Sequence, residues 1–396
     1  MRARKLSGGG TIAHVPNEGR YTGVSIQWVV PACTTDDRET AVADTRAVRH
    51  RVALGLVVLV FVGCTGAPTA SVGSPVAPAA TPVGEVVPII IDTDMAPDDW
   101  LAILLLLGRA DAEVRAIMVT GTGEAHCEPG VRHALALVKL AGDSGIPVAC
   151  GRETPLAGDH AFPDPWREGV DALLGIEIAD GGAPASVDAV ELLTATVLAD
   201  PGTVTVLALG PLTNVAEAIA ASPELVEAIP SVVVMGGAVE TGGNVGVSGV
   251  GIDNDVAEWN IYVDPLAAKQ VLESGVPVTL VPLDATNSVP VTEAFAERVA
   301  AEAASPELAF AAAVFAGRRD SIASGSYFFW DPLAAAVALD ESVVSLDARP
   351  LTVVAEEGPT SGGIVDGAAD GPVVRFATSA DGARFEAMFL EALGGG

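Results

Sequence analysis

The chain has 396 residues, about half of them hydrophobic, which suits one α/β domain of roughly 300 residues and leaves little room for a second catalytic domain. It carries 51 acidic and 21 basic side chains, and from Pro88 onward the counts are 45 acidic and 13 basic. A surface this acidic repels nucleic-acid phosphates and anionic lipid headgroups. It argues against a polymer-binding protein and favours a small, neutral or metal-bridged substrate.

The N-terminal part contains a candidate export signal. A basic cluster at 49–51 precedes an apolar run at 52–62, and Cys64 follows shortly after. This order is typical of a signal peptide, and the run is shorter than the roughly 20 residues that a membrane span needs. We predict a signal peptide at 48–64 with a lipobox-like end and a lipid anchor on Cys64, so that the protein is exported as a membrane lipoprotein. A plain secretory signal and a buried strand are the alternatives.

Two further N-terminal segments are predicted to lie outside the folded domain. Residues 1–47 show no periodicity, which indicates disorder or a start site assigned too far upstream. Residues 65–84 consist of Ala, Pro, Gly, Ser, Thr and Val without a charge, a composition typical of an extended tether, which we place at 65–87. The catalytic domain is predicted at 88–393.

Short β-branched runs then alternate with amphipathic stretches. The predicted strands are 87–92, 114–120, 147–150, 204–209, 231–235, 276–281, 351–355 and 373–377. The predicted helices are 98–107, 130–141, 187–198, 212–220, 265–273, an Ala-rich region at 292–322, 331–339 and 383–393. Continuous apolar strands between helices predict an α/β fold with a Rossmann-like, mostly parallel sheet flanked by helices on both faces. Ligands bind at the carboxyl ends of such strands, where the polar clusters fall.

Aspartates gather where the first predicted strand ends. Asp92, Asp94, Asp98 and Asp99 lie within eight residues. Four carboxylates this close repel one another unless a cation holds them, and hard oxygen ligands are those that Ca²⁺ prefers. A helix N-cap role for Asp98 is the alternative, but it explains only one of the four. The sequence therefore predicts a calcium site directly after this strand.

The same segment resembles the signature of the inosine–uridine-preferring nucleoside hydrolase family, Asp-x-Asp-Pro-Gly-x-Asp-Asp, with Met95-Ala96-Pro97 in place of Pro-Gly-x. Four further motifs resemble those of the family and follow in its order: Leu209-Gly210-Pro211-Leu212-Thr213-Asn214, Met235-Gly236-Gly237-Ala238, Ala257-Glu258-Trp259-Asn260 with Asp264-Pro265, and Asp331-Pro332-Leu333. The resemblance covers residues 88–393. It implies the nucleoside hydrolase fold and hydrolysis of the N-glycosidic bond of ribonucleosides to base and ribose, here for extracellular nucleoside salvage.

The resemblance also implies roles for individual residues. The calcium ligands would be Asp94, Asp99, Asp331 and the backbone carbonyl of Leu209. Asp94 would accept the proton of the attacking water as general base. Asp98, Asn260 and Asp331 would bind the ribose hydroxyls.

The resemblance places Asn244 and Glu258 on the 5′ side of the ribose. Because the stretch after Asn244 is longer than the family's usual spacer, Asn254 is an alternative for that role. A capping role at the strand-to-helix turn is the alternative for Glu258 and Asn260. Asp284 is either a supporting partner of the site or a turn residue.

Two departures from the family pattern affect recognition of the base. Thr122 stands where the family often has Asn, and Trp330 stands where many members have His. An indole is not a general acid near neutral pH, but it stacks on a base, which favours purines. The aromatic run 327–330 has core packing as its alternative.

Two other functions fit parts of the sequence. A haloacid-dehalogenase-like phosphatase also begins with Asp-x-Asp after a strand, but it needs a lysine near the phosphoryl group, and Lys139 and Lys269 lie inside predicted helices. A surface-anchored nucleoside or sugar binder without turnover is the second rival. Cys127 and Cys150 are expected to be separate thiols, with a disulfide as the alternative. The oligomeric state stays open, with a homo-oligomer among the alternatives.

Overall fold

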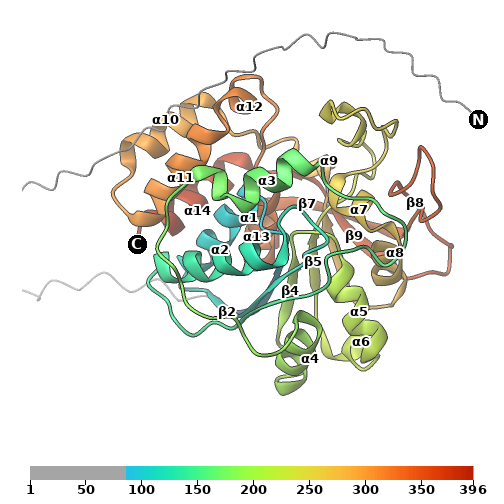
Figure 1. Ribbon diagram of the computed structural model, residues 1–396. Helices are drawn as coiled ribbons and strands as arrows, with labels where there is room; N and C mark the ends of the chain where they lie inside the picture. The colour runs from blue at the N-terminus through green and yellow to red at the C-terminus, as the bar shows by residue number, and fades with distance from the viewer. Residues whose placement is uncertain (1–85, 396) are drawn as a thin grey trace, which may run out of the picture. The chain divides into compact units, whose positions relative to one another are not determined.

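The computed structural model describes residues 86–395 (Figure 1). The segment 1–47, the signal 48–64 with Cys64, and nearly all of the tether 65–87 lie outside these residues. Among the described residues, no helix combines the length and the apolar character that crossing a lipid bilayer requires.

A nine-stranded sheet forms the centre of the described domain, in the order β3-β2-β1-β4-β5-β6-β9-β7-β8. The strands are β1 (Val87–Thr93), β2 (Ala112–Val119), β3 (Val148–Cys150), β4 (Thr205–Ala208), β5 (Val232–Met235), β6 (Val278–Val281), β7 (Val344–Val353), β8 (Ile364–Asp366) and β9 (Val373–Ala380). Pairing is parallel from β3 through to β9, and β7 is antiparallel to both of its neighbours. The predicted Rossmann-like, mostly parallel sheet is confirmed.

The apolar run of β1 shows why the sheet is covered on both faces. Ile89, Ile90 and Ile91 are all fully buried. Successive side chains of a strand point to opposite faces, so Ile89 and Ile91 enter one core cluster and Ile90 enters the other. A strand that is apolar at every position therefore needs a helix layer on each side.

Two layers of helices supply that cover (Figure 1). One core cluster contains residues of α1 (Pro97–Leu107), α2 (Cys127–Leu140), α9 (Leu283–Thr286), α10 (Glu293–Glu302), α11 (Pro306–Gly317), α12 (Arg319–Ala323), α13 (Trp330–Leu339) and α14 (Gly382–Leu393). The other contains residues of α4 (Ala189–Ala199), α5 (Thr213–Ala221), α6 (Leu225–Ala228) and α8 (Pro265–Glu273).

The predicted Ala-rich helical region at 292–322 is divided into α10, α11 and α12. The break before α11 is explained by its capping: Ser305 accepts a hydrogen bond from the backbone N–H of Leu308 at 3.0 Å, and Pro306 occupies the first helical position. Both residues begin a new helix instead of continuing the previous one.

Other elements are longer than predicted or were not predicted. The strand predicted at 351–355 begins seven residues earlier, at Val344, because the mostly exposed first half of β7 carries little apolar pattern. The helices α3 (Asp164–Asp171), α6, α7 (Trp259–Val263) and α9 and the strand β8 were not predicted. All of them are short, and short elements give weak periodic signals.

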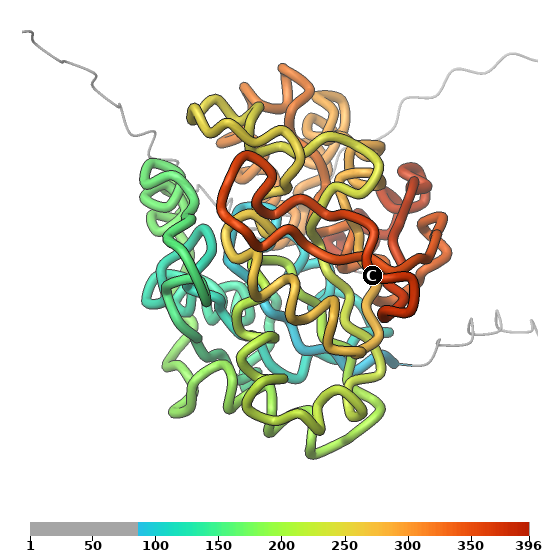
Figure 2. Tube along the Cα trace, turned by 90° about the vertical axis from the view of Figure 1, so that its right-hand side faces the viewer, coloured from blue at the N-terminus to red at the C-terminus, as the bar shows by residue number. Residues whose placement is uncertain are grey.

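The β7–β8 hairpin lies beside the long loop 236–258, as Figure 2 shows for the red hairpin and the yellow loop. A bridge pairs Ala257 with Gly363. The amide of Asn254 also donates to the carbonyl oxygen of Ser361 at 2.7 Å. The hairpin therefore anchors a loop that forms part of the candidate site.

Candidate active site

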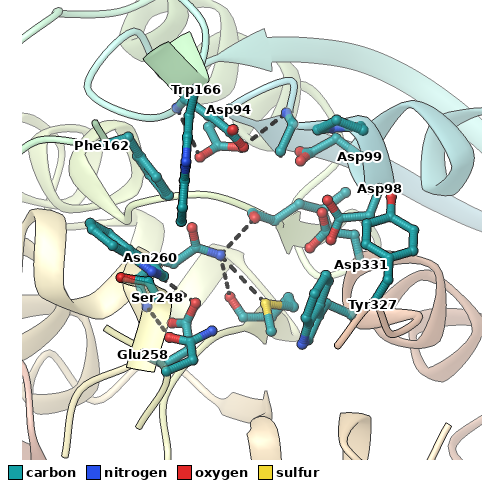
Figure 3. A pocket seen from close by; sticks show the side chains of 18 of the residues that line it. Asp94, Asp98, Asp99, Phe162, Trp166, Ser248, Glu258, Asn260, Tyr327 and Asp331 are labelled. Atoms are coloured by element: carbon teal, nitrogen blue, oxygen red, sulfur yellow. Dashed lines mark hydrogen bonds between the residues drawn. The ribbon is translucent and has the colours of Figure 1, made fainter. Parts of the chain in front are cut away.

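A cavity of about 380 Å³ opens at the carboxyl ends of the parallel strands (Figure 3). Its wall contains six carboxylic acids: Asp94, Asp98, Asp99, Glu124, Glu258 and Asp331. It also contains Leu209 after β4 and Met235 at the end of β5. The parallel sheet brings these residues together because its strands end at one edge.

Three of the acids follow β1: Asp94 lies in the turn before α1, and Asp98 and Asp99 lie in the first turn of α1. The hydroxyl of Thr93 donates to Oδ1 of Asp99 and accepts from the backbone N–H of Met95 at 3.0 Å. Met95 is fully buried and adopts a left-handed conformation with φ of 61°. Proline cannot adopt this φ, so the turn differs from a Pro-Gly turn at the position where the sequence departs from the family signature.

Asp94 is held by the backbone around it. Its Oδ2 accepts from the N–H of Glu124 at 3.1 Å, and its Oδ1 accepts from the N–H of Ala96 at 3.3 Å. Burial raises the pKa of Asp94 to about 6, while hydrogen bonds from Asp99 and from these backbone groups oppose the rise. A carboxylate with this pKa is ionised at neutral pH and can accept a proton in the reaction.

Asp98, Asp99 and Asp331 form the tightest acidic cluster. Each offers a carboxylate oxygen, and the three oxygens lie within 4.8 Å of one another. No group among residues 86–395 donates to Oδ2 of Asp99 or to Oδ1 of Asp331, and both atoms are buried. Burial raises the pKa of Asp99 and of Asp331 well above the usual range, and the charges of the neighbouring aspartates raise it further. Unpaired buried oxygens of this kind fit a hard divalent cation.

The predicted metal ligands all lie at or beside this acidic cluster, and Asp98 joins them. Asp99 and Asp331 lie in the cluster, Asp94 lies beside Asp99, and Leu209 lines the same cavity. The family resemblance assigned Asp98 to the ribose and not to the metal, yet its carboxylate is one of the three that lie closest together.

Glu258 both caps a helix and lines the cavity. It is the N-cap of α7 and accepts from the N–H groups of Asn260 at 2.9 Å and Gly237 at 3.0 Å. Burial raises its pKa to about 7, although these backbone hydrogen bonds lower it. The capping alternative therefore describes the structure, but it does not exclude a role in the cavity.

Two asparagines complete this side of the cavity. The amide of Asn260 donates to the carbonyl oxygens of Leu209 at 2.9 Å and Met235 at 3.2 Å, as the dashed lines of Figure 3 show. Asn244 also lines the cavity, and its Oδ1 accepts from the N–H of Trp259 at 3.1 Å. Asn254 is buried against the β7–β8 hairpin and is absent from the wall of the cavity, so Asn244 is the asparagine in place.

The aromatic run before α13 is divided between core and cavity. Phe329 is buried and packs against Phe295, Phe385 and Phe389. Tyr327 and Trp330 line the cavity, with their rings edge to face at 5.4 Å.

Several further residues of the cavity wall were not predicted from the sequence. Phe162 stacks on Trp259 at 5.2 Å, and Trp166 on α3 contacts the same indole at 5.3 Å (Figure 3). Arg318 is the only basic residue in the described cavity wall. The aromatic residues lie in a stretch without periodicity, where their composition alone was the available signal.

Thr122 lies outside the cavity wall. It is buried, and its hydroxyl donates to the carbonyl oxygens of Arg152 and Thr154, which lie 3.2 and 3.3 Å away. Asp284 accepts from the N–H groups of Val239 at 2.9 Å and Glu240 at 2.7 Å, which fits the turn role.

The expectation of two separate thiols was wrong. Cys127 and Cys150 form a disulfide, with their Cα atoms 5.6 Å apart. Cys127 is the first residue of α2 and Cys150 is the last residue of β3, so the sheet edge brings together two cysteines that are 23 residues apart in the sequence.

Known proteins are similar in sequence to part of this chain. A pyrimidine-specific ribonucleoside hydrolase RihA from Klebsiella pneumoniae is 37% identical over 212 residues, which are 53% of this chain and 65% of that protein. The RihA of Shewanella woodyi is 37% identical over 215 residues, 54% of this chain and 65% of the relative. The chain therefore matches less than two thirds of the length of these relatives.

Solved structures resemble the whole described domain. A plant nucleoside hydrolase has a TM-score of 0.70 and 27% identity, covering 78% of this chain and 99% of its own. A purine-preferring ribonucleoside hydrolase from Gardnerella vaginalis has a TM-score of 0.66 and 27% identity, covering 78% and 98%. The family described as inosine-uridine preferring nucleoside hydrolase matches residues 89–387, which contain every motif noted above. The chain therefore belongs to the inosine-uridine preferring nucleoside hydrolase family.

Proposed function

We propose that this protein hydrolyses the N-glycosidic bond of ribonucleosides to a free base and ribose. The observation that carries the proposal is the arrangement of the cavity. Asp94, Asp98, Asp99 and Asp331 lie at one part of its wall, and Glu258 and Asn260 lie across from them (Figure 3). Such a wall offers hydrogen-bond acceptors to the hydroxyls of a ribose.

The family is one of metal-dependent hydrolases, and we propose Ca²⁺ as the metal. The buried, unpaired oxygens of Asp99 and Asp331 support an all-oxygen site, and Asp94 and the carbonyl of Leu209 would complete it. When bound, the ion would lower the pKa of a water molecule and orient it for attack.

The chain's own residues would carry out the remaining steps. Asp94 would take the proton of the attacking water, since its carboxylate is ionised at neutral pH and held by two backbone N–H groups. Asp98, Asp331 and Oδ1 of Asn260 would accept hydrogen bonds from the ribose hydroxyls. The carboxylates would also stabilise the positive charge that develops on the sugar as the base departs.

Asn244 and Glu258 would bind the 5′ side of the ribose. Glu258 is buried at the base of the cavity wall and is oriented by backbone N–H groups on both sides of it. A polar group fixed in this way discriminates well, because a substrate without the matching hydroxyl leaves it unpaired.

Trp330 would stack on the base, with Tyr327 beside it. Its indole lines the cavity, and no residue among 86–395 accepts a hydrogen bond from its Nε1. A two-ring base gains more contact with an indole than a one-ring base does, which favours purines. The relatives differ in the base that their names give: the Klebsiella protein is called pyrimidine-specific, whereas the Gardnerella protein is called purine-preferring.

A substrate panel tests the proposal. Inosine, adenosine, guanosine, uridine and cytidine are incubated with the full chain, with calcium present or chelated, and ribose is measured as reducing sugar. We expect ribose release only with calcium. Phosphate release from an ester without ribose release would support the phosphatase instead, and nucleoside binding without either product would support the binder.

Export as a membrane lipoprotein belongs to the same proposal, with nucleoside salvage outside the cell as its purpose. The Cys127–Cys150 disulfide supports an oxidising compartment, where such bonds persist. In a bacterial host that processes lipoproteins, the protein should fractionate with membranes, and Cys64→Ala should release it or block processing. Cys33→Ala is the matched control. Soluble cytoplasmic protein from the parent and both variants would contradict the signal.

A further inference from the structure

The loop between β2 and α2, residues 120–126, forms a backbone cradle for Asp94. The N–H of Glu124 donates to Oδ2 of Asp94 at 3.1 Å, and the N–H of Ala125 donates to its main-chain oxygen at 2.9 Å. Gly123 lies directly against the Asp94 side chain. This loop therefore holds Oδ2 of the Asp94 carboxylate, while the N–H of Ala96 holds Oδ1.

The sheet fixes one end of the loop. The N–H of Thr120 donates to the carbonyl oxygen of Thr93 at 2.8 Å, which continues the pairing of β2 with β1. The other end enters α2 at Cys127, and the disulfide joins that residue to Cys150 at the end of β3. The disulfide is thus the covalent link that ties the far end of the cradle to the sheet.

Further contacts connect the loop to the segment after β3. The N–H of Cys127 donates to Oε1 of Glu153 at 2.8 Å, and the hydroxyl of Thr122 reaches the carbonyl oxygens of Arg152 and Thr154. These contacts are noncovalent and depend on the two segments staying close. The disulfide adds a covalent link between the same two parts of the chain.

The disulfide is reachable from outside the active-site cavity. Cys127 and Cys150 are both half-buried, and both line a second cavity of about 550 Å³. That cavity lies between α2 and residues 180–187, and it shares no wall residue with the first. This second cavity is therefore the route by which a small dithiol would approach the disulfide without entering the first cavity.

We propose that the Cys127–Cys150 disulfide is a redox-dependent positioning element for Asp94. In the oxidised protein the bond holds the loop 120–126 in the position that orients Asp94. A dithiol would break the S–S bond, supplying two electrons and two protons to leave two thiols, and would itself close to a cyclic disulfide. The loop would then lose its covalent tie. This inference rests on the proposed function, since Asp94 is the base of that reaction.

The expected effect is on turnover rather than on substrate affinity. Reduction should lower kcat about tenfold, which is the size expected when a hydrogen bond to a charged group is lost. KM should stay within about twofold, because Glu258, Asn244 and Asn260 bind the ribose from other elements. A purely structural disulfide would not produce this split between kcat and KM.

The test compares oxidised and dithiothreitol-treated protein, in full-length chains. Thiol titration confirms that the bond has opened, ribose release gives kcat and KM, and hydrogen–deuterium exchange follows the peptide covering 120–126. We expect kcat to fall and exchange of that peptide to accelerate, with both reversed on reoxidation. The double variant Cys127→Ser, Cys150→Ser should behave as the reduced protein and should not respond to the reductant, whereas Cys33→Ala should respond as the parent does.

Two results would overturn the proposal. One is a reduced disulfide with unchanged kcat and unchanged hydrogen–deuterium exchange at 120–126. The other is accelerated exchange throughout the sheet, which would mean that the disulfide stabilises the whole domain and not the loop 120–126 in particular. If the oxidised protein hydrolyses no nucleoside, the proposed function fails, and the exchange of 120–126 alone then decides the positioning proposal.

Discussion

Gly123 leaves no room for a side chain beside Asp94: a Cβ atom on Gly123 would lie 2.1 Å from the Cβ of Asp94 and 2.5 Å from its Oδ2. Gly123→Ala should therefore displace the Asp94 carboxylate, and we expect kcat to fall by about 10² or more, since a shift of about 1 Å in a reacting group costs this much. The measurement is steady-state ribose release. In Gly382→Ala the new methyl group meets only Val289 at 3.7 Å, so this variant should retain kcat. Comparable losses in both variants would contradict the close-packing argument.

Removal of the metal should abolish activity and lower the melting temperature. Burial raises the pKa of Asp99 and Asp331 well above the usual range, so protons compete with a cation for these carboxylates. Calcium binding should release protons, and its apparent affinity should rise with pH. Calorimetric titration in two buffers of different ionisation enthalpy measures that release. Full activity after exhaustive chelation, with no calcium found by elemental analysis, would refute the metal site.

Asp94→Asn removes the proposed base while keeping the shape of the side chain. We expect kcat to fall by about 10² to 10⁴, with most of the substrate affinity retained. Calcium content has to be measured in the same samples, because Asp94 is also a proposed ligand.

Asp92→Asn is the matched control for Asp94→Asn. Burial raises the pKa of Asp92 to about 8, and Asn214 donates to its Oδ1 at 2.8 Å outside the cavity wall. An amide replaces a neutral acid here, so kcat should stay within about threefold, a change of under 1 kcal/mol in the barrier. Equal losses for the two variants would mean that the role of Asp94 is structural.

Trp330→Ala should reduce kcat/KM for purine nucleosides three- to tenfold more than for pyrimidine nucleosides. Aromatic stacking contributes about 0.5 to 1.5 kcal/mol beyond area burial, which sets this modest scale. The comparison uses inosine and uridine. Phe328→Ala removes a neighbouring ring that is absent from the cavity wall, and it should leave the ratio unchanged. Equal losses for both substrates in Trp330→Ala would remove the support for a purine preference.

His133 should make the fold less stable in mild acid. It is 4% exposed, and burial together with the charge of Arg132 lowers its pKa from 6.5 to about 4. Between these values the unfolded chain binds the proton and the native protein does not, so stability falls as pH falls from about 6.5 toward 4. The loss should amount to about 3 kcal/mol. Urea unfolding across this range should show a shallower pH dependence for His133→Gln, and an identical slope would contradict the assignment.

Much of the fold followed from simple patterns in the sequence. Runs such as Ile89-Ile90-Ile91 identify strands that are buried on both faces, and the acids after β1 and in the first turn of α13 identify the carboxyl edge of the sheet. These signals are local, and a parallel sheet converts them into one site because its strands end together.

The parts that sequence analysis missed depend on contacts between distant segments. Phe162 and Trp166 belong to a stretch without periodicity, and only its packing against Trp259 brings them to the cavity. The Cys127–Cys150 disulfide was only the alternative to two separate thiols, because the pairing depends on how α2 begins beside β3. Thr122 was expected to contact the nucleobase of the substrate. The orientation of its loop directs the hydroxyl to the carbonyl oxygen of Arg152 instead.

The acidic cluster joins α1, which carries Asp98 and Asp99, to α13, which carries Asp331 more than 200 residues later. During synthesis the first two acids emerge long before the third, so the nascent chain lacks the complete ligand set until most of the domain has left the ribosome. The cation therefore cannot act as a template for early folding. The cation would bind the folded domain and stabilise it by mass action. A chain truncated before α13 would lack Asp331 and would be unable to bind the cation in this way.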